Sequence, residues 1–359
     1  MTTVRVEHKL GIKASPTCVL ELGAGDDCHG YLLEGENRGM SQMFRLMNEA
    51  RLTVAYQGLG SASGAFRNAL AYAQERIQGI PIEKGKEQGA KRVPIVHHPD
   101  VRNMLMTMKA TVEGLRGLIY ATAFYRDLAH FGPAETRQEY LDLVDILTPV
   151  AKIAGADQGF EVVRLGVQVL GGVGYTEEFP LAQALRDTKI ASIYEGTSGI
   201  QALDLVTRKL PLRNGELFQT LLRKLGDLEP AHAKSESLHQ AIAAWQEEVE
   251  RLKQTVGSLR NLAQELGPRE SVFNASEVAT FFGDVCCAYY LLKMGVVAEG
   301  HLKDGLEAAR EAASEDEEIR FYFNKVKTAE HYVFQILPRA RAVAAKVQAR
   351  NFAALEAVF

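Results

Sequence analysis

Glu195 is the residue of this sequence best placed to do chemistry. It follows the apolar segment 190–193 and directly precedes Gly196. A carboxylate held against apolar surroundings is harder to ionise, so it can accept a proton near neutral pH. Gly196 lets a substrate approach the backbone closely, and Thr197 can cap the following helix or bind a ligand. The residue types predict a general base here, with an ordinary exposed turn as the alternative.

A second candidate site is a cluster of glycines. Gln168 lies near the end of a helical stretch and is followed by Gly171, Gly172 and Gly174. A backbone without side chains lets a ligand come close. A helix C-cap followed by a turn explains the same residues, so both interpretations stay open.

Three other patterns do not predict sites. The glycines within 58–64 lack the dinucleotide-loop spacing and follow no strand, so we expect small residues in a closely packed helix. The adjacent His97 and His98 would point to different faces of the chain, and we expect no metal there. Cys286 and Cys287 lie in an apolar helical stretch, where free cysteine acts as a small apolar side chain.

Composition narrows the class of protein. The chain has 359 residues, 47% of them hydrophobic, with 41 basic and 45 acidic residues and a net charge of −4. These values argue against a disordered chain and give no electrostatic reason to expect nucleic acid as a partner. We see no uncharged apolar run long enough to span a bilayer and no apolar segment typical of a signal peptide. We therefore expect no membrane span and a cytoplasmic location.

The sequence pattern divides the chain into three regions, whose strands and helices must position the candidate residues. Within residues 1–38, apolar and polar side chains alternate over residues 4–8, and glycines separate short apolar pieces. This pattern predicts two to four short strands that pair with another segment. Residues 39–211 repeat apolar residues every three or four positions, which predicts helices. In residues 212–359 glycines become fewer, and the apolar seam from Ile242 to Leu262 predicts a long amphipathic helix. Further helices are expected at about 101–128, 135–154 and 158–170, and others beginning near 276 and 315.

Six segments, in this order, resemble the acyl-CoA dehydrogenase family. The resemblance covers about residues 4–210, and the extension after 211 resembles the longer bacterial members, of the methylthiopropionyl-CoA dehydrogenase type. The segments are Gly35-Glu36-Asn37-Arg38-Gly39-Met40, Asn48-Glu49-Ala50-Arg51, Tyr72-Ala73-Gln74-Glu75-Arg76, Gln168-x-x-Gly171-Gly172-x-Gly174-Tyr175, Arg186-Asp187 and Ile193-Tyr194-Glu195-Gly196-Thr197-Ser198.

The resemblance implies a mainly α fold. Residues 1–38 would be a short β remnant of the family's middle domain, and residues 39–211 its C-terminal four-helix bundle domain. Residues 212–359 would be an additional antiparallel helical domain. The family's N-terminal helical domain and the first half of the β domain are not expected in this chain. A fragment, a truncated gene product and half of a split enzyme are the alternatives.

The family oxidises an acyl-CoA thioester to the trans-2-enoyl-CoA with FAD, and Glu195 matches its catalytic base. Glu195 would take the α-proton while a hydride leaves the β-carbon for flavin N5. The backbone N–H of Glu195 would polarise the thioester carbonyl. Electrons would pass to an electron-transferring flavoprotein. The alternative is a flavin-free helical assembly module without activity of its own.

The resemblance also assigns the binding residues. Some of the FAD contacts cross a subunit interface in the family, so a homodimer or homotetramer is expected. The residues expected at FAD are Arg76, Gln168, Gly171, Gly172 and Thr197. The residues expected at the acyl-CoA substrate are Asn48, Arg51 and Gly196. No metal is expected.

Overall fold

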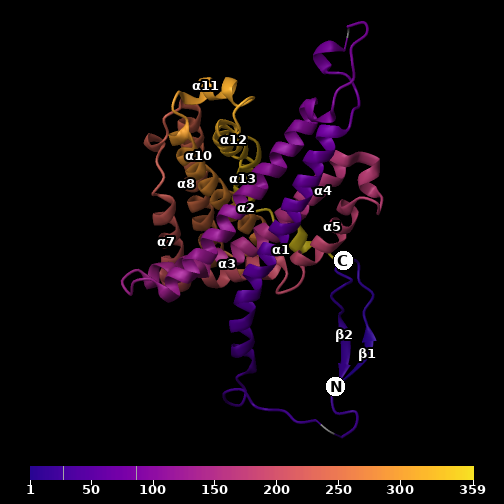
Figure 1. Ribbon diagram of the computed structural model, residues 1–359. Coiled ribbons are helices and arrows are strands. Elements are labelled where there is room, and N and C mark those ends of the chain that lie inside the picture. Colours follow the sequence, from indigo (N-terminus) through magenta and orange to yellow (C-terminus); the bar gives the residue numbers. More distant parts are fainter. Residues whose placement is uncertain (27, 86) are drawn as a thin grey trace.

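The computed structural model describes residues 1–26, 28–85 and 87–359, apart from the side chains of Phe44, Arg45 and Asn48. Helices dominate, and the strands form one two-stranded sheet (Figure 1). The expectation of a mainly α fold is thereby confirmed. The long helices are α1 Gly39–Glu75, α2 Pro99–Phe131, α3 Arg137–Ile153, α4 Gly159–Leu170, α8 Glu236–Glu265, α10 Ala275–His301 and α12 Glu317–His331. Shorter ones are α5 Pro180–Thr188, α6 Ser198–Asp204, α7 Glu216–Leu225, α9 Pro268–Ser271, α11 Gly305–Ala312, α13 Arg339–Ala349 and α14 Ala353–Glu356.

Helix α1 is the longest helix of the first helical bundle, which α1 forms with α2, α3 and α4. Its 37 residues span about 55 Å, and it packs along α4, α2 and α3. The close approach depends on Gly58, where a Cβ atom would overlap the carbonyl of Gly155. The predicted close packing is confirmed at Gly58. At Gly60 and Gly64, by contrast, a Cβ would meet nothing within 4 Å.

A π-helical turn, Ala154–Gln158, joins α3 to α4. We refer to these five residues as the π-turn. The sequence pattern predicts two helices with a junction near this point, and the structure joins them without a loop. A π-turn inserts one residue into a helix and is frequent at functional sites. It shifts the side chains after residue 158 to a different face from those before residue 154.

The helices after residue 215 pack on α2 and share its hydrophobic core. Helix α10 lies at the centre of this second bundle, and Phe281, Phe282 and Tyr289 are almost fully buried. The indole N–H of Trp245 on α8 donates to the carbonyl of Val285, at 3.0 Å. In the described part of the chain, residues 268–301 contain an 18-residue window with the hydropathy of a membrane span, but 72% of that window is buried inside the protein. Burial of this kind is typical of a core helix.

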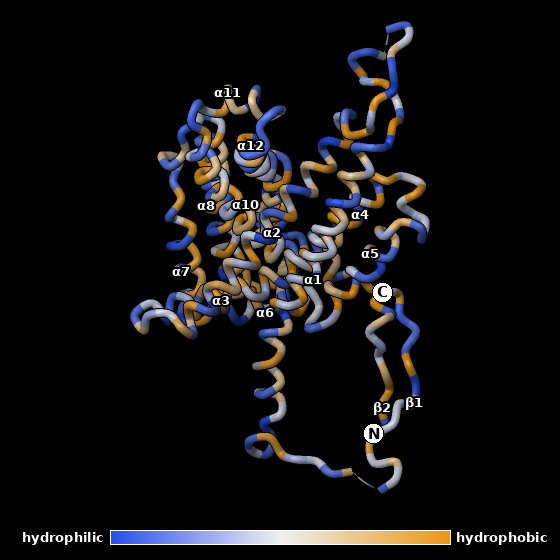
Figure 2. Tube along the Cα trace, viewed as in Figure 1, coloured by the Kyte–Doolittle hydropathy of each residue, from blue (hydrophilic) through white to orange (hydrophobic). Residues whose placement is uncertain are grey.

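Strands β1 (Thr2–Val6) and β2 (Cys18–Glu21) form an antiparallel hairpin beside the bundle (Figure 1). The backbone N–H of Ile12 donates to the carboxylate of Asp187, at 2.6 Å, and so ties the hairpin to the end of α5. The first turns of α1 also project away from the bundle, and Figure 2 shows apolar residues there. Met40, Met43 and Leu46 are exposed. The strands β1 and β2 pair with each other, and the predicted pairing of this region with another segment stays a prediction.

Candidate functional site

Glu195 has an unusual backbone conformation. Its φ is +57°, in the left-handed region that residues other than glycine seldom adopt, and Gly196 follows with φ +85°. A Cβ atom on Gly196 would lie 2.5 Å from the amide nitrogen of Gln201. Strained conformations of this kind persist only where the surrounding structure fixes them, and they occur preferentially at functional sites.

Three neighbours fix the segment around Glu195. The hydroxyl of Tyr194 donates to the side-chain oxygen of Gln57 on α1. The hydroxyl of Ser198 donates to Asp157 of the π-turn, at 3.0 Å. The fully buried amide of Gln201 lies 3.5 Å from the carbonyl oxygen of Glu195, to which it donates. The segment around Glu195, residues 194–198, is therefore held from α1, from the π-turn and from α6.

Two buried cations lie within electrostatic reach of Glu195. Arg51 is 6% exposed, and burial lowers its pKa, although the charges of Asp204 and Glu195 act in the opposite direction. Lys152 is fully buried, and its ammonium has no hydrogen-bond partner among the described residues. Burial lowers the pKa of Lys152 to about 8, against the charges of Asp157 and Glu195.

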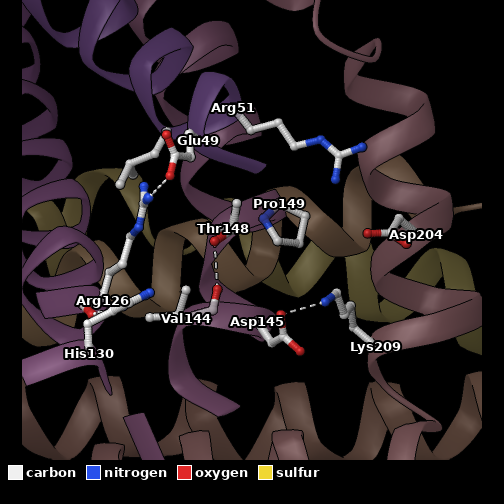
Figure 3. A pocket seen from close by; sticks show the side chains of 11 residues that line it. Glu49, Arg51, Arg126, His130, Val144, Asp145, Thr148, Pro149, Asp204 and Lys209 are labelled. Atoms are coloured by element: carbon white, nitrogen blue, oxygen red, sulfur yellow. Dashed lines mark hydrogen bonds and ion pairs between the residues drawn. The ribbon is translucent and has the colours of Figure 1, made fainter. Parts of the chain in front are cut away.

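Arg51 also lines a cavity of about 260 Å³ between α1, α2, α3 and α6, where charged and apolar side chains meet (Figure 3). Three cations, Arg51, Arg126 and Lys209, face the carboxylates of Glu49, Asp145 and Asp204. Arg126 pairs with Glu49, and Lys209 pairs with Asp145 at 2.9 Å. Arg51 extends toward Asp204 in Figure 3. The cavity can accommodate a polar, charged part of a ligand, and Glu195 is not among the residues that line it.

The residues expected at the diphosphate of FAD lie at the opposite end of α1. Helices α1 and α4 run in parallel, because Gly58 meets the π-turn while Ala65 meets Gly166 further along. Arg76 follows the end of α1, about 30 Å along the helix from Gln57. The structure therefore brings Arg51, Glu195, Gly196 and Thr197 together. It places Arg76, Gln168, Gly171 and Gly172 in a second group, away from Glu195.

This second group has the properties of an anion site. Gly171 and Gly172 are exposed, and a Cβ on either would meet nothing within 4 Å. Gly171 has φ +65°. Arg76 is exposed beside the same end of the bundle, and its planar guanidinium suits a phosphate oxygen. The open backbone and the exposed guanidinium could hold a phosphate group.

Thr197 and His98 have local roles in the structure. The Thr197 hydroxyl oxygen accepts from the backbone N–H of Ile200, at 3.2 Å, so the predicted helix cap is confirmed. The Nε2 of His98 donates to the carbonyl of Gln78, at 2.7 Å. Among the described residues, no group of three or more His, Cys, Asp or Glu could hold a metal ion. The side chain of Asn48 lies outside the described part of the chain, so its predicted role stays a prediction.

Sequence reasoning missed Lys152, Asp157 and Gln201. Lys152 carries a signal, because it is a single charge in the apolar run 149–154. Asp157 and Gln201 carry no comparable signal. Asp157 contacts Ser198, 41 residues away in the sequence, and Gln201 contacts Glu195, six residues away. Their roles emerge only from the fold.

Comparisons with known proteins match two stretches of the chain to family models. The family described as "Acyl-CoA dehydrogenase, C-terminal domain" matches residues 37–210, and "Acetyl-CoA dehydrogenase C-terminal like" matches residues 221–357. The chain is 36% identical to 3-methylmercaptopropionyl-CoA dehydrogenase of Ruegeria pomeroyi, over 93% of this chain and 54% of that protein. It is 31% identical to the broad-specificity linear acyl-CoA dehydrogenase FadE5 of Mycobacterium tuberculosis, over 93% of this chain and 54% of that protein.

Solved structures show the same fold. The Caenorhabditis elegans protein ACDH-11, in complex with C11-CoA, matches with a TM-score of 0.71 at 19% identity, over 98% of this chain and 54% of that chain. An acyl-CoA dehydrogenase from Bacillus anthracis, complexed with FAD, matches with a TM-score of 0.65 at 20% identity, over 97% of this chain and 63% of that chain. The chain spans about half the length of the curated relatives it matches.

Proposed function

This chain belongs to the acyl-CoA dehydrogenase family, and on that premise we propose that it carries the catalytic base of such an enzyme, Glu195. The observation that supports the proposal is the geometry of Glu195. It is held in a left-handed conformation by contacts from three elements, with Arg51 and Lys152 in electrostatic reach. An ordinary exposed turn has no need for such a set of constraints.

The proposed reaction is the α,β-dehydrogenation of an acyl-CoA thioester to the trans-2-enoyl-CoA. The Glu195 carboxylate takes the proton from the α-carbon, and the electron pair of that C–H bond becomes the new double bond. FAD, when bound, supplies the acceptor for the hydride that leaves the β-carbon. The backbone N–H of Glu195 donates to the thioester oxygen, which makes the α-proton more acidic. Gly196 leaves room for the thioester next to the base.

The residues at the other end of α1 would hold the diphosphate of FAD from a neighbouring subunit. Arg76 supplies a fixed positive charge, and the bare backbone at Gly171 and Gly172 supplies space beside Gln168. This arrangement favours a homodimer or homotetramer, because the base and the diphosphate site of one chain are too far apart for one flavin. Thr197 would face the flavin beside the base. We propose an electron-transferring flavoprotein as the electron acceptor and the cytoplasm as the location.

The test begins with the purified chain, incubated with FAD and passed over a gel-filtration column. The proposal predicts that flavin absorbance co-elutes with the protein and is bleached by acyl-CoA without oxygen. Glu195→Gln should keep the flavin and lose the bleaching. Glu161→Gln, on an exposed face of α4, is the matched control and should bleach like the parent. Failure to retain flavin would favour the assembly module instead.

A further inference from the structure

Asp284 is a buried carboxylate in an apolar helix of the second bundle. It lies on α10 and is 1% exposed. Arg339 of α13 donates to it from two nitrogens, one at 2.7 Å, and the Tyr332 hydroxyl donates at 3.3 Å. Burying a charge is unfavourable unless such partners satisfy it. One further donor, Gln158, comes from outside the second bundle.

Gln158 is the last residue of the π-turn. Its side-chain amide donates to Asp284 at 2.9 Å, and the side chain is 5% exposed. The neighbouring Gly283 allows this approach, because a Cβ there would lie 3.2 Å from Ala154 and 3.6 Å from the Gln158 amide. The opposite side of the π-turn meets α1 at Gly58. The π-turn is therefore held between α1 and α10.

Asp157 precedes Gln158 and faces a different element. It accepts the hydrogen bond from Ser198, three residues after Glu195. Burial raises the pKa of Asp157, while the Ser198 hydrogen bond and the charges of Lys152 and Lys189 act in the opposite direction. The two consecutive residues 157 and 158 thus connect the segment around Glu195 to α10 through the π-turn.

We propose that the C-terminal helices position the catalytic base, through the hydrogen bond from Gln158 to Asp284 and that from Ser198 to Asp157. This inference rests on the proposed role of Glu195 and gives residues 275–349 a part in the same reaction. Asp284, Gln158 and Asp157 are positioning residues, because they act on Glu195 through the backbone. The strained φ of Glu195 makes such support necessary, since an unsupported left-handed glutamate relaxes to another conformation.

Gln158→Met is the sharpest test variant. Methionine has a similar length and fills the same space, and Asp284 keeps Arg339 and Tyr332 as donors. Asp284→Asn would weaken the ion pair itself, so it tests stability as much as position. Tyr289→Phe is the matched control, because it removes a 2.6 Å hydrogen bond of the same helix to Asp227 without touching the π-turn.

Hydrogen–deuterium exchange of the chain without cofactor gives the first readout. We expect Gln158→Met to speed exchange selectively at the amides of residues 193–201, and Tyr289→Phe to leave that segment unchanged. Unchanged exchange there in Gln158→Met would overturn the proposal, and so would an increase spread evenly over the bundle. Because this readout needs no flavin, it remains decisive even if the proposed reaction is wrong.

The kinetic readout uses the flavin-loaded chain. We expect Gln158→Met to slow acyl-CoA-dependent bleaching about ten-fold or more, with the acyl-CoA concentration for half-maximal rate little changed. Ser198→Ala should slow it similarly, and the double variant should be no slower than either single one, because both break the same support. Additive effects of the two variants would contradict the proposal. The proposal would also be contradicted if Glu195→Gln lost bleaching while Gln158→Met and Ser198→Ala bleached at the parent's rate.

Discussion

At the scale of single residues, Gly196 has the most restricted position in the site. Its φ of +85° and its contact with Gln201 leave no room for a side chain. We expect Gly196→Ala to lower the free energy of unfolding by about 1–3 kcal/mol. Gly64→Ala, in the interior of α1 with open space around it, should instead raise it by about 0.5–1 kcal/mol. Urea denaturation of both variants checks the pair, and equal effects would contradict this account of the turn.

Lys152 should give the stability of the protein a distinct pH dependence. Its pKa falls from 10.5 to about 8 on burial, so between these values the unfolded chain binds a proton that the folded chain does not. Stability from this residue therefore rises with pH across that window, by on the order of 2 kcal/mol. Lys152→Met should remove this rise.

The measurement is the free energy of unfolding of parent and variant at about pH 7 and about pH 10. The difference between the two proteins isolates Lys152 from tyrosines and cysteines that titrate in the same range. Lys346→Met, on an exposed face of α13, is the control and should track the parent. A Lys152→Met profile parallel to that of the parent would show that the ammonium is hydrated in the folded protein.

At the scale of elements, Asp187 ties the N-terminal hairpin to the bundle. Its carboxylate accepts from the backbone of Ile12 at 2.6 Å, and Gly11 packs directly on Arg186 and Asp187. We expect Asp187→Ala to free the hairpin without unfolding the bundle. Limited proteolysis should then cut within residues 1–38 faster, with the fragment 39–359 left intact. Asp204→Ala, at the end of α6, should not accelerate that cut, and an unchanged cleavage rate in Asp187→Ala would place the anchor elsewhere.

The sequence was informative about elements where periodicity or turn chemistry is strong. The strand at Cys18–Glu21, the long helix through Ile242 and Leu262, and the packing role of Gly58 were predictable for that reason. The π-turn was not, because a single inserted residue leaves no mark in an apolar run such as 150–154. The same holds for the contacts of Asp157 and Gln158, which join segments 41 and 126 residues apart.

At the scale of the whole molecule, helix α2 belongs to both halves. Leu115, Leu118 and Ile119 are fully buried, and Gly117 lets α10 approach so closely that a Cβ would lie 2.6 Å from Tyr290. Lys325 of α12 reaches Glu113 of α2 at 2.9 Å. Residues 37–210 and 221–357 match two different domain models, yet the two regions share one continuous hydrophobic core.

A truncation tests the shared core. Removal of residues 212–359 uncovers one face of α2, so we expect the fragment 1–211 to lose cooperative thermal unfolding. Removal of the exposed residues 356–359 alone should leave the transition within a few degrees of the parent. Circular dichroism during heating checks both chains. A cooperative transition of fragment 1–211 near that of the full chain would show that the first bundle is independent.

The central claim is that Glu195 removes the α-proton of an acyl-CoA thioester. The most direct measurement is α-proton exchange in D2O, with the flavin-loaded chain and a thioester that carries sulfur at the β-position, so that no hydride can leave. Mass spectrometry of the recovered thioester should show deuterium incorporation with the parent and with Glu161→Gln, and none above the solvent background with Glu195→Gln. Exchange that persists in Glu195→Gln at the parent's rate would contradict the assignment of the base.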